Sequence, residues 1–429
     1  MEHQVKIGLF GFGCVGQGLY DVLSQSRGFR TTIKRIVVKD PSKKRSLPAS
    51  MFAYDKNEIL NDPEINLVVE LIDNAKDAYE IVSTALRNGK NVVSANKKMI
   101  AENFEELVRL QHEFGTSLLY EASSCGSIPI LPNLEEYYDN ELLRAVSGIF
   151  NGSSNYILTK VQNEHLDYAT ALRQAQELGF AESDPTLDVE GFDAKYKLVI
   201  ITGHTFGVFA RPEDVLNLGI GNLAVGDVEF AQSRGKRIRL VANTFQLDDQ
   251  RISLFVTPRL VAKDDQLYNV NNEYNAVILE AAFSDKQLFV GKGAGGHPTG
   301  SAVLSDISAN AYHYRYEYKK YHQQARFTYS TEIELEVYLR SNDPVLFDEI
   351  GFTSISERGI NYVSGVNYVI GTIGLKDLIR HRERINASGS FLAATGEVIV
   401  LDGSRKERKQ LSANAYHYRY EYKKYHQQA

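Results

Sequence analysis

The stretch Val5–Gly16, VKIGLFGFGCVG, decides the fold of the N-terminal part of this chain. Its first half, Val5 to Phe10, is a short apolar run typical of a buried strand. A glycine-rich turn begins at Gly11, and Gln17 to Ser26 then carries helix formers with apolar residues on one face. A GxGxxG motif alone is a weak signal. Here it follows a predicted strand and opens a predicted helix, and in that context it indicates dinucleotide binding.

The motif consists of Gly11, Phe12, Gly13, Cys14, Val15 and Gly16. The first glycine permits the tight turn, the second lets the backbone approach a pyrophosphate, and the third lets the helix pack on the strand. The pyrophosphate then lies over the unpaired N–H groups of the helix N-terminus. We therefore expect NAD or NADP as cofactor. A purely structural glycine turn is the alternative.

Charged residues after the second predicted strand bear on the choice of cofactor. Asp40 lies 24 residues after Gly16, near the distance expected for an acid that accepts from the 2′-hydroxyl of NAD. Four cations around it could instead hold the 2′-phosphate of NADP: Lys39, Lys43, Lys44 and Arg45. These cations could also form a solvated loop, so the sequence leaves the preference open.

Further apolar runs follow the first strand at regular intervals. Ile33–Asp40, Leu67–Ile72, Asn91–Ser94 and Leu118–Leu119 are predicted strands, with helical stretches between them. Strands that alternate with helices form parallel βαβ units. The sequence predicts an α/β fold class, with a Rossmann-type doubly wound sheet over residues 1–130.

The pattern changes after this domain. Ser147–Phe150 and Ile252–Pro258 are predicted strands, and Tyr168–Leu178 and Ala194–Thr202 are predicted helices. This mixture indicates an α+β substrate domain over residues 131–307.

A small α+β module is predicted over residues 326–405. IELEVYLR at residues 333–340 alternates as a strand does, residues 343–359 indicate a helix, and residues 361–374 indicate more strand. This order loosely resembles an ACT-type domain, which implies a small-molecule sensor.

One segment occurs twice without a single difference, at Ser308–Ala325 and at Ser412–Ala429. Structural repeats diverge and come in three or more copies, so a recent duplication or an artefact explains this pair better. The tyrosines of the first copy have a period of two, which predicts a strand that completes the folded body over residues 308–325. We expect residues 404–410 to be a linker and residues 406–429 a disordered tail.

Composition excludes several classes of protein. The net charge of -6 argues against a nucleic-acid partner, which needs a basic surface. No apolar stretch is long enough for a membrane span, and the N-terminus has no signal-peptide pattern. The two cysteines, Cys14 and Cys125, form neither a disulfide framework nor a metal knuckle. We expect a cytoplasmic protein, and no histidine shows the spacing of a zinc site.

The densest cluster of ionisable residues lies in the stretch 175–197. It contains Glu182, Asp184, Asp188, Asp193 and Lys197 in a segment interrupted by glycine and proline. Asp193 and Lys197 are four residues apart, so on a helix they share one face. This pattern indicates a polar active site, and a solvated loop with a helix cap at Asp193 is the alternative.

At this point the chain resembles the homoserine dehydrogenases. The stretch 175–197 fits their signature, which ends in DP, D-x2-G-x-D and a lysine. Four further blocks agree in the same order: Ser94–Lys97 with TANK, Glu121–Pro129 with EA-x5-P, Asn151–Leu158 with NGTTNYIL, and Gly293–Ser301 with GAGG-x-PT-x-S. The likeness covers residues 5 to 307.

The resemblance implies the interconversion of aspartate 4-semialdehyde and homoserine, a step toward threonine, methionine and isoleucine. Lys197 matches the residue that exchanges a proton with the substrate oxygen, and Lys97 matches a second active-site lysine. Glu182 and Asp193 match carboxylates that hold the substrate, chiefly its ammonium, and we expect Asp188 to bind the substrate as well. An ammonium near the substrate oxygen stabilises the developing alkoxide. We expect two nearby lysines to lower the pKa of each other.

The resemblance also implies residues for the cofactor and for a monovalent cation. Further cofactor contacts are expected at Asn74, Ala75, Lys97 and Gly296, the last near the nicotinamide. A site for Na⁺ or K⁺, built largely from backbone carbonyls, is expected at Glu121, Ser124, Gly126 and Ile128.

This chain departs from the family pattern at a few positions. Ile72-Asp73-Asn74 stands where many members have a glycine pair, Phe180 stands where tyrosine is common, and Cys125 and Ser127 replace smaller residues. None of these changes touches the lysines or the acidic groups, so they bear on cation preference and substrate affinity.

Two other functions compete with this interpretation. A semialdehyde dehydrogenase that forms a thioester needs an activated cysteine, for which Cys125 is the loop candidate. A non-catalytic dinucleotide-binding regulator should tolerate loss of Lys197. The family resemblance also implies a homodimer or higher homo-oligomer. The family includes bifunctional members with a kinase ahead of the dehydrogenase, and we expect a monofunctional enzyme because the sequence starts directly at the dinucleotide fold.

Overall fold

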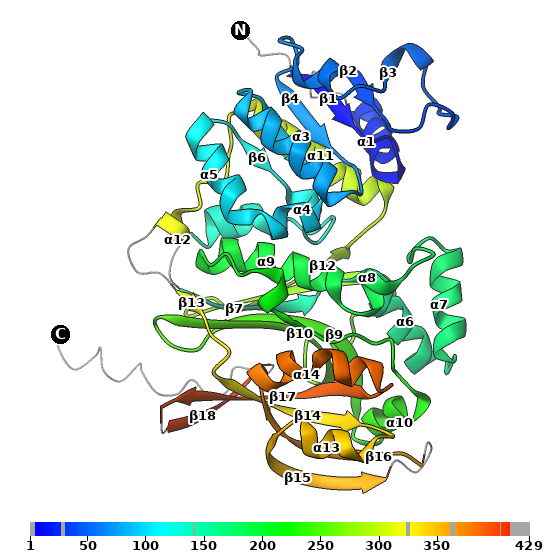
Figure 1. The fold of residues 1–429 in the computed structure, drawn as a ribbon, viewed down its shortest axis with the longest axis vertical. Coiled ribbons are helices and arrows are strands. Elements are labelled where there is room, and N and C mark those ends of the chain that lie inside the picture. The colour runs from blue at the N-terminus through cyan, green and yellow to red at the C-terminus, as the bar shows by residue number, and fades with distance from the viewer. Residues whose placement is uncertain are drawn as a thin grey trace, which may run out of the picture.

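The computed structural model describes residues 5–26, 31–139, 142–322, 327–360, 365–403 and 405–411. Two sheets organise these residues (Figure 1). A parallel sheet with its helices lies at one end of the molecule and a mixed sheet at the other, with helix α9 (Phe192–Phe206) between them. This arrangement confirms the predicted α/β class.

The first sheet is parallel throughout and has the strand order β3-β2-β1-β4-β5-β6. Its strands are β1 (Val5–Phe10), β2 (Thr31–Val37), β3 (Phe52–Ala53), β4 (Leu67–Glu70), β5 (Asn91–Ser94) and β6 (Leu118–Leu119). This is the order of a dinucleotide-binding Rossmann fold, in which ligands bind beyond the carboxyl ends of the strands.

Helices cover both faces of this sheet, as Figure 1 shows. They are α1 (Cys14–Gln25), α2 (Asn57–Leu60), α3 (Ala75–Arg87), α4 (Lys97–Glu102), α5 (Phe104–Phe114) and α11 (Gly296–Ala311). Helix α11 comes from far along the chain and packs against α1 and β5. The chain therefore returns to the first domain after it has formed the second. The predicted boundaries at residues 130 and 307 do not include this return.

The second sheet has the strand order β12-β11-β7-β9-β10-β17-β14-β16-β15. Its first part consists of β7 (Leu143–Ile149), β9 (Lys236–Gln246), β10 (Arg251–Ala262), β11 (Tyr274–Ala281) and β12 (Asp285–Lys292), with the short strands β8 (Leu216–Asn217) and β13 (Thr328–Tyr329) beside β10. The helices of this part are α6 (Gly152–Asn163), α7 (Tyr168–Glu177), α8 (Thr186–Val189), α9 and α10 (Val225–Ser233). Within the described residues no helix is long and apolar enough to cross a membrane.

The remaining strands belong to the C-terminal module. It runs β14 (Ile333–Arg340), α13 (Pro344–Glu349), β15 (Phe352–Ile360), β16 (Asn367–Gly374), α14 (Leu375–Ala387), β17 (Phe391–Asp402) and β18 (Arg405–Gln410). The single helix predicted over residues 343–359 is wrong in its second half, because Gly351 ends α13 with a φ of 73° and an extended strand follows. Residues 405–410, expected within a linker and tail, instead pair with β17.

The first copy of the duplicated segment does not form the predicted strand. Its first residues, 308–311, end α11, an irregular stretch follows, and α12 (Lys319–His322) closes the described part. Tyr316 and Tyr318 are nonetheless buried, against Tyr120 and His204. Aromatic burial rather than strand pairing therefore accounts for the tyrosine pattern. The second copy, at residues 412–429, lies outside the described residues.

Candidate active site

An aspartate of the second domain binds two lysines, one from each domain. Asp193 lies in the first turn of α9, and its Oδ2 is 2.8 Å from Nζ of Lys197, one turn later. Its Oδ1 is 2.8 Å from Nζ of Lys97, the first residue of α4. Lys197 also donates to the carbonyl oxygen of Phe150 at 2.8 Å. Residues predicted from two separate motifs, 94–97 and 175–197, therefore form one charged cluster.

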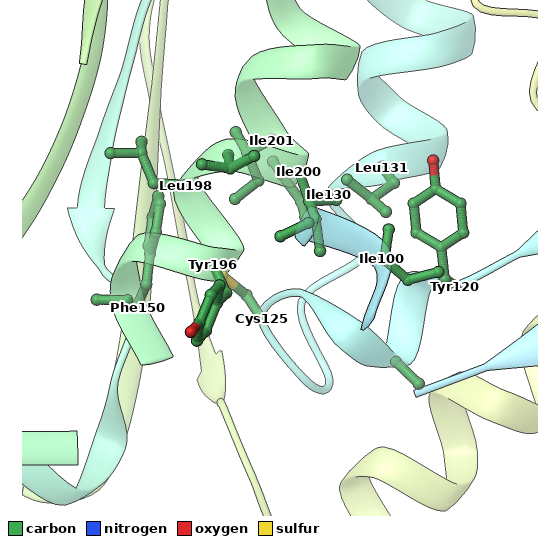
Figure 2. Packing of buried hydrophobic residues seen from close by; sticks show 14 of the residues in the cluster. Ile100, Tyr120, Cys125, Ile130, Leu131, Phe150, Tyr196, Leu198, Ile200 and Ile201 are labelled. Atoms are coloured by element: carbon green, nitrogen blue, oxygen red, sulfur yellow. The ribbon is translucent and has the colours of Figure 1, made fainter. Parts of the chain in front are cut away.

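Local sequence explains how α9 presents these groups. Gly191 precedes the helix with a φ of 79°, a left-handed backbone that favours glycine. Asp193 is stabilised in the first turn by the partial positive charge of the helix N-terminus. The apolar stretch Leu198–Ile201 is fully buried, and Figure 2 shows three of its side chains inside the hydrophobic cluster. Lys197 is therefore carried by a buried helix and is only 5% exposed.

Asn151 holds the acidic groups in place, although its motif alone did not mark it as a site residue. Its Nδ2 donates to Oδ1 of Asp188 at 2.7 Å and to Oδ2 of Asp193 at 2.9 Å. Its Oδ1 accepts from the backbone N–H of Ser154 and so caps α6. An asparagine followed by glycine at a strand end was the available signal, because such a residue is a natural helix N-cap.

Charge pairing sets the ionisation of the cluster. Burial alone would raise the pKa of Asp193, but Lys197 and then Lys97 lower it well below its usual range. Asp193 in turn raises the pKa of Lys97, with smaller contributions from Asp188 and Glu182. The expected mutual lowering of the two lysine pKa values is therefore wrong for Lys97, because a carboxylate lies between the ammonium groups. Burial, followed by Asp193, raises the pKa of Asp188 to about 6.

Glu182 occupies the exposed rim of this cluster. It lies in the turn between α7 and α8, and its negative charge contributes to the raised pKa of Lys97. Within the described residues its carboxylate forms no ion pair. Three carboxylates therefore surround Lys97, and the exposed one is available to a ligand.

The glycine turn has the shape that a dinucleotide requires. Gly11 has a φ of 92°, and a Cβ there would lie 2.5 Å from the carbonyl oxygen of Leu71. A Cβ at Gly16 would lie 2.7 Å from the carbonyl oxygen of Gly11. A Cβ at Gly13 would meet nothing within 4 Å, so this position faces open space. No side chain caps α1, which leaves its N-terminal N–H groups to an anion.

A second helix begins beside this turn. Gly296 starts α11, again without a side-chain cap, and a Cβ there would lie 2.8 Å from the carbonyl oxygen of Cys14. Further along, Gly300 and Gly18 bring the two helix backbones into contact. Two uncapped helix N-termini therefore meet at one place, and the residues present fit a pyrophosphate. The rest of the motif is placed consistently: the Phe12 ring packs on Phe52, and Val15 is half-buried.

The loop after β2 lies beside α1, where the ribose of a dinucleotide is expected. Ser46 donates to Oε1 of Gln17. Asp40 is exposed, and its Oδ1 accepts from the backbone N–H and hydroxyl of Ser42, which lowers the pKa of Asp40. Arg45 donates to the carbonyl oxygen of Asp40 and lies over the Phe52 ring. Lys39, Lys43 and Lys44 are exposed. The acid and the cations are thus in the same loop.

Asn74 and Ala75 lie at the carboxyl end of β4. Asn74 caps α3, with its Oδ1 accepting from the backbone N–H of Asp77 at 2.9 Å. Ala75 is the first residue of α3 and is half-buried. The asparagine that replaces one of the usual glycines therefore starts a helix at the edge where the cofactor is expected.

The loop expected to bind a cation is buried and closely packed. Both carboxylate oxygens of Glu121 accept backbone N–H groups, from Ile130 at 2.8 Å and from Leu131 at 2.9 Å. Ser124 Oγ is buried without a hydrogen-bond partner among the described residues. Gly126 has a φ of 60° and lies against the backbone of Lys292 and Gly293. Ile128 is buried. The part of the chain that the structure describes holds no cluster of three His, Cys, Asp or Glu side chains suited to a metal.

The environment of Cys125 opposes a thioester mechanism. Burial raises the pKa of its thiol to about 12, and the side chain is fully buried. A nucleophilic cysteine requires the opposite, a thiol with a lowered pKa at an accessible place. Figure 2 shows Cys125 inside the apolar cluster with Tyr196 and Phe150.

Comparison with known proteins agrees with this geometry over both domains. Residues 11–121 match the family model described as homoserine dehydrogenase, NAD binding domain, and residues 129–308 match the model described as homoserine dehydrogenase. Homoserine dehydrogenase of Bacillus subtilis is 36% identical over 314 residues, which cover 71% of this chain and 72% of the relative. That of Helicobacter pylori is 35% identical over 314 residues, covering 72% and 74%.

Solved structures extend the likeness to the C-terminal module. A homoserine dehydrogenase from Thiobacillus denitrificans matches with a TM-score of 0.76 and 28% identity, over 95% of this chain and 99% of its own. A hyperthermophilic archaeal homoserine dehydrogenase mutant in complex with NADPH matches with a TM-score of 0.63 and 26% identity, over 73% of this chain and 99% of its own. The two family models together match most of the chain, and the curated relatives cover both domains, so the chain belongs to the homoserine dehydrogenase family.

Proposed function

We propose that Lys197 exchanges the proton with the substrate oxygen when this enzyme interconverts aspartate 4-semialdehyde and homoserine. The observation that carries the proposal is the cluster in which Asp193 binds Lys197 and Lys97. A lysine ammonium has three N–H groups, and two of those of Lys197 are directed to Asp193 and Phe150. The third remains for the substrate.

The charge distribution suits the reaction. The nicotinamide cofactor supplies or accepts the hydride. Negative charge that develops on the aldehyde oxygen during reduction is stabilised by the ammonium groups of Lys197 and Lys97. Lys197 then donates its proton to the alkoxide, and in the reverse direction it takes the proton from the hydroxyl. Asp193 orients both lysines through its two oxygens, and it raises the pKa of Lys97.

The carboxylates provide the contacts for the other end of the substrate. The α-ammonium of homoserine needs acidic partners, and charge-assisted hydrogen bonds are the stronger ones. Glu182 is exposed beside Lys97, and Asp188 and Asp193 line the cluster behind it. We assign substrate binding to these three residues, with Glu182 the first to meet the ammonium.

We place the cofactor at the turn Gly11–Gly16, beside the start of α11 at Gly296. Asp40, Asn74, Ala75 and Lys97 lie around this edge of the sheet. Both cofactor assignments remain supported, since Asp40 and the cationic residues share one loop. Initial rates with homoserine and each of NAD and NADP test the function and the preference together. No rate with either cofactor would contradict the function.

We further propose a Na⁺ or K⁺ site at the loop that contains Glu121, Ser124, Gly126 and Ile128. The support is the orphaned Ser124 hydroxyl and the left-handed turn at Gly126. Replacing Na⁺ and K⁺ by choline in the assay should lower the rate, and an unchanged rate would remove this site.

The C-terminal module supports a second role, as a sensor for a small molecule. Its elements follow the order strand-helix-strand-strand-helix-strand, and its strands lie in the order β17-β14-β16-β15. This is a ferredoxin-like arrangement, which fits the proposed ACT-type domain. A buried ion pair between Arg340 and Asp227, at 2.8 Å, joins it to α10. Calorimetry with threonine tests the idea, and neither binding nor inhibition at millimolar concentration would remove it.

We also propose a homodimer in the cytoplasm. Strand β12 is at the edge of the mixed sheet, and it exposes Leu288 and Val290. Exposed apolar groups on an edge strand favour a partner.

A further inference from the structure

A carboxylate is buried inside the first domain, and no cation among the described residues pairs with it. Glu70 ends β4 between Phe10 of β1 and Ser94 of β5, and it is 0% exposed. Within the described residues it forms no ion pair, and two neutral donors bind it instead. Ser94 donates its hydroxyl to Oε2 at 2.6 Å, and the backbone N–H of Ile72 donates to Oε1 at 2.7 Å. An unpaired buried acid is costly, so its retention at this place calls for a role.

The hydrogen bonds continue from Glu70 to the first turn of α4. Ser94 Oγ accepts from the backbone N–H of Asn96 at 3.1 Å. The side chain of Asn96 then acts twice: its Nδ2 donates to the carbonyl oxygen of Ile72 at 2.9 Å, and its Oδ1 caps α4 at the N–H of Met99. Lys97 is the next residue and the first of the helix. One carboxylate therefore fixes both the loop after β4 and the loop that carries Lys97.

We propose that Glu70 is a positioning residue, which acts through Ser94 and Asn96 to hold Lys97 against Asp193. This inference rests on the active-site role proposed for Lys97. The side chain of Lys97 is 38% exposed and has Asp193 as its ion-pair partner, so its position depends on where α4 begins. A displacement of about 1 Å in an active site can cost a factor of about 100 in rate.

The same carboxylate gives the network a dependence on pH. Burial raises the pKa of Glu70 to about 7. The negative charge of Asp73 also raises this pKa. The groups across the sheet, Phe10 and Ser94, are neutral. Above pH 7 both oxygens accept a hydrogen bond. Below pH 7 the acid gains a proton that must itself be donated, so the hydrogen bond at the protonated oxygen is reversed or lost and the network before Lys97 is weakened.

Three variants of the full-length enzyme test the proposal. Glu70→Gln keeps the shape but cannot titrate, Ser94→Ala interrupts the network, and Ser94→Thr keeps the hydroxyl. We measure kcat and KM for homoserine from pH 5.5 to 9, together with the thermal midpoint. Glu70→Gln should show a low kcat without the step near pH 7. Ser94→Ala should lose about tenfold or more in kcat, and Ser94→Thr should recover most of it.

Two results would overturn the proposal. One is a Glu70→Gln enzyme that keeps the wild-type kcat and its step near pH 7. The other is a Ser94→Thr enzyme as slow as Ser94→Ala, with an unchanged thermal midpoint. The variant Lys97→Met is measured alongside. It distinguishes a wrong positioning role for Glu70 from a wrong active-site role for Lys97. If Lys97→Met itself were fully active, the role of Lys97 would be wrong, and so would any positioning role built on it.

Discussion

The carboxylate of Asp193 and the ammonium of Lys97 meet across the boundary of the two domains, with Oδ1 and Nζ 2.8 Å apart. Asp193 is 4% exposed, and its other oxygen binds Lys197 on the same helix. A buried carboxylate that lost one lysine would keep the other as its partner. Each lysine can therefore be removed separately, and the two roles can be measured apart.

Lys197→Met should lower turnover by about 100-fold or more, since general acid–base groups usually contribute at least that much. Cofactor affinity should stay nearly unchanged, because Lys197 lies on α9 and not at the glycine turn. Steady-state rates and fluorescence titration with the cofactor check both points. Lys195→Met is a matched control on the same helix, since the Lys195 ammonium lies over the Phe192 ring and forms no ion pair among the described residues. A Lys197→Met enzyme with more than about a tenth of the wild-type rate would contradict the proton-transfer role.

Glu182→Gln should raise the KM for homoserine by about tenfold or more, through loss of a charge-assisted contact with the substrate ammonium. The turnover number should change less, because Glu182 lies at the rim and not beside the reacting oxygen. Asp184→Asn is the control: this carboxylate is two residues away and bonds locally to the backbone N–H of Thr186. An unchanged KM in Glu182→Gln, or an equal change in both variants, would show that Glu182 does not bind the substrate ammonium.

Substrate affinity should fall in acid with a midpoint near pH 6. The pKa of Asp188 is raised to about 6, first by burial and then by Asp193. Above pH 6 Asp188 is ionised and attracts the substrate ammonium, and below pH 6 it is neutral. The ammonium stays protonated throughout this range, so KM for homoserine should rise as the pH falls from 7 to 5. Asp188→Asn should remove this rise. A wild-type KM that is flat over the same range would show that Asp188 does not contribute.

The enzyme should have twice the chain mass of 48.2 kDa in solution. If β12 forms the contact, Leu288→Glu with Val290→Glu should yield monomers, because two charges cannot be buried at an apolar edge without partners. Ile355→Glu is the control, since Ile355 is similarly exposed on β15 at the other edge of the sheet. Light scattering over micromolar dilution measures the mass. A single-chain mass for the wild-type protein would rule out the dimer.

The parallel sheet could be predicted well, and local patterns explain why. The strand at Val5–Phe10 and the glycine turn after it are both short-range signals, and Asn91–Ser94 has the bounds predicted for it. The pair Asp193–Lys197 also follows from helical spacing. The contact of Lys97 with Asp193 could not be predicted from spacing, because it depends on how two domains pack.

The errors cluster where tertiary contacts decide the structure. Residues 405–410 are nearly all charged, which indicates a linker, yet they form an edge strand on which Lys406 pairs with Glu334 at 2.9 Å. Edge strands tolerate charge because one face remains in water. The helix predicted over residues 343–359 runs through Gly351, but the left-handed φ of this glycine separates α13 from β15.

Deletion of Ser412–Ala429 should leave activity and dimerisation unchanged, because the place for this sequence is already filled. In the first copy, Gln111 donates to the carbonyl oxygen of Tyr316 at 2.8 Å, and the Tyr318 hydroxyl lies 2.7 Å from that of Tyr120. This copy directly follows α11, so it occupies its position at a much higher effective concentration than a distant tail. Tyr316→Ala should therefore destabilise the protein by about 3–5 kcal/mol, as truncation of a buried aromatic does. Tyr420→Ala, the same change in the tail, should not. Thermal unfolding of the two variants and light scattering of the truncated enzyme give the answer. Equal destabilisation by both substitutions, or a truncated enzyme of altered mass or rate, would mean that the tail belongs to the working structure.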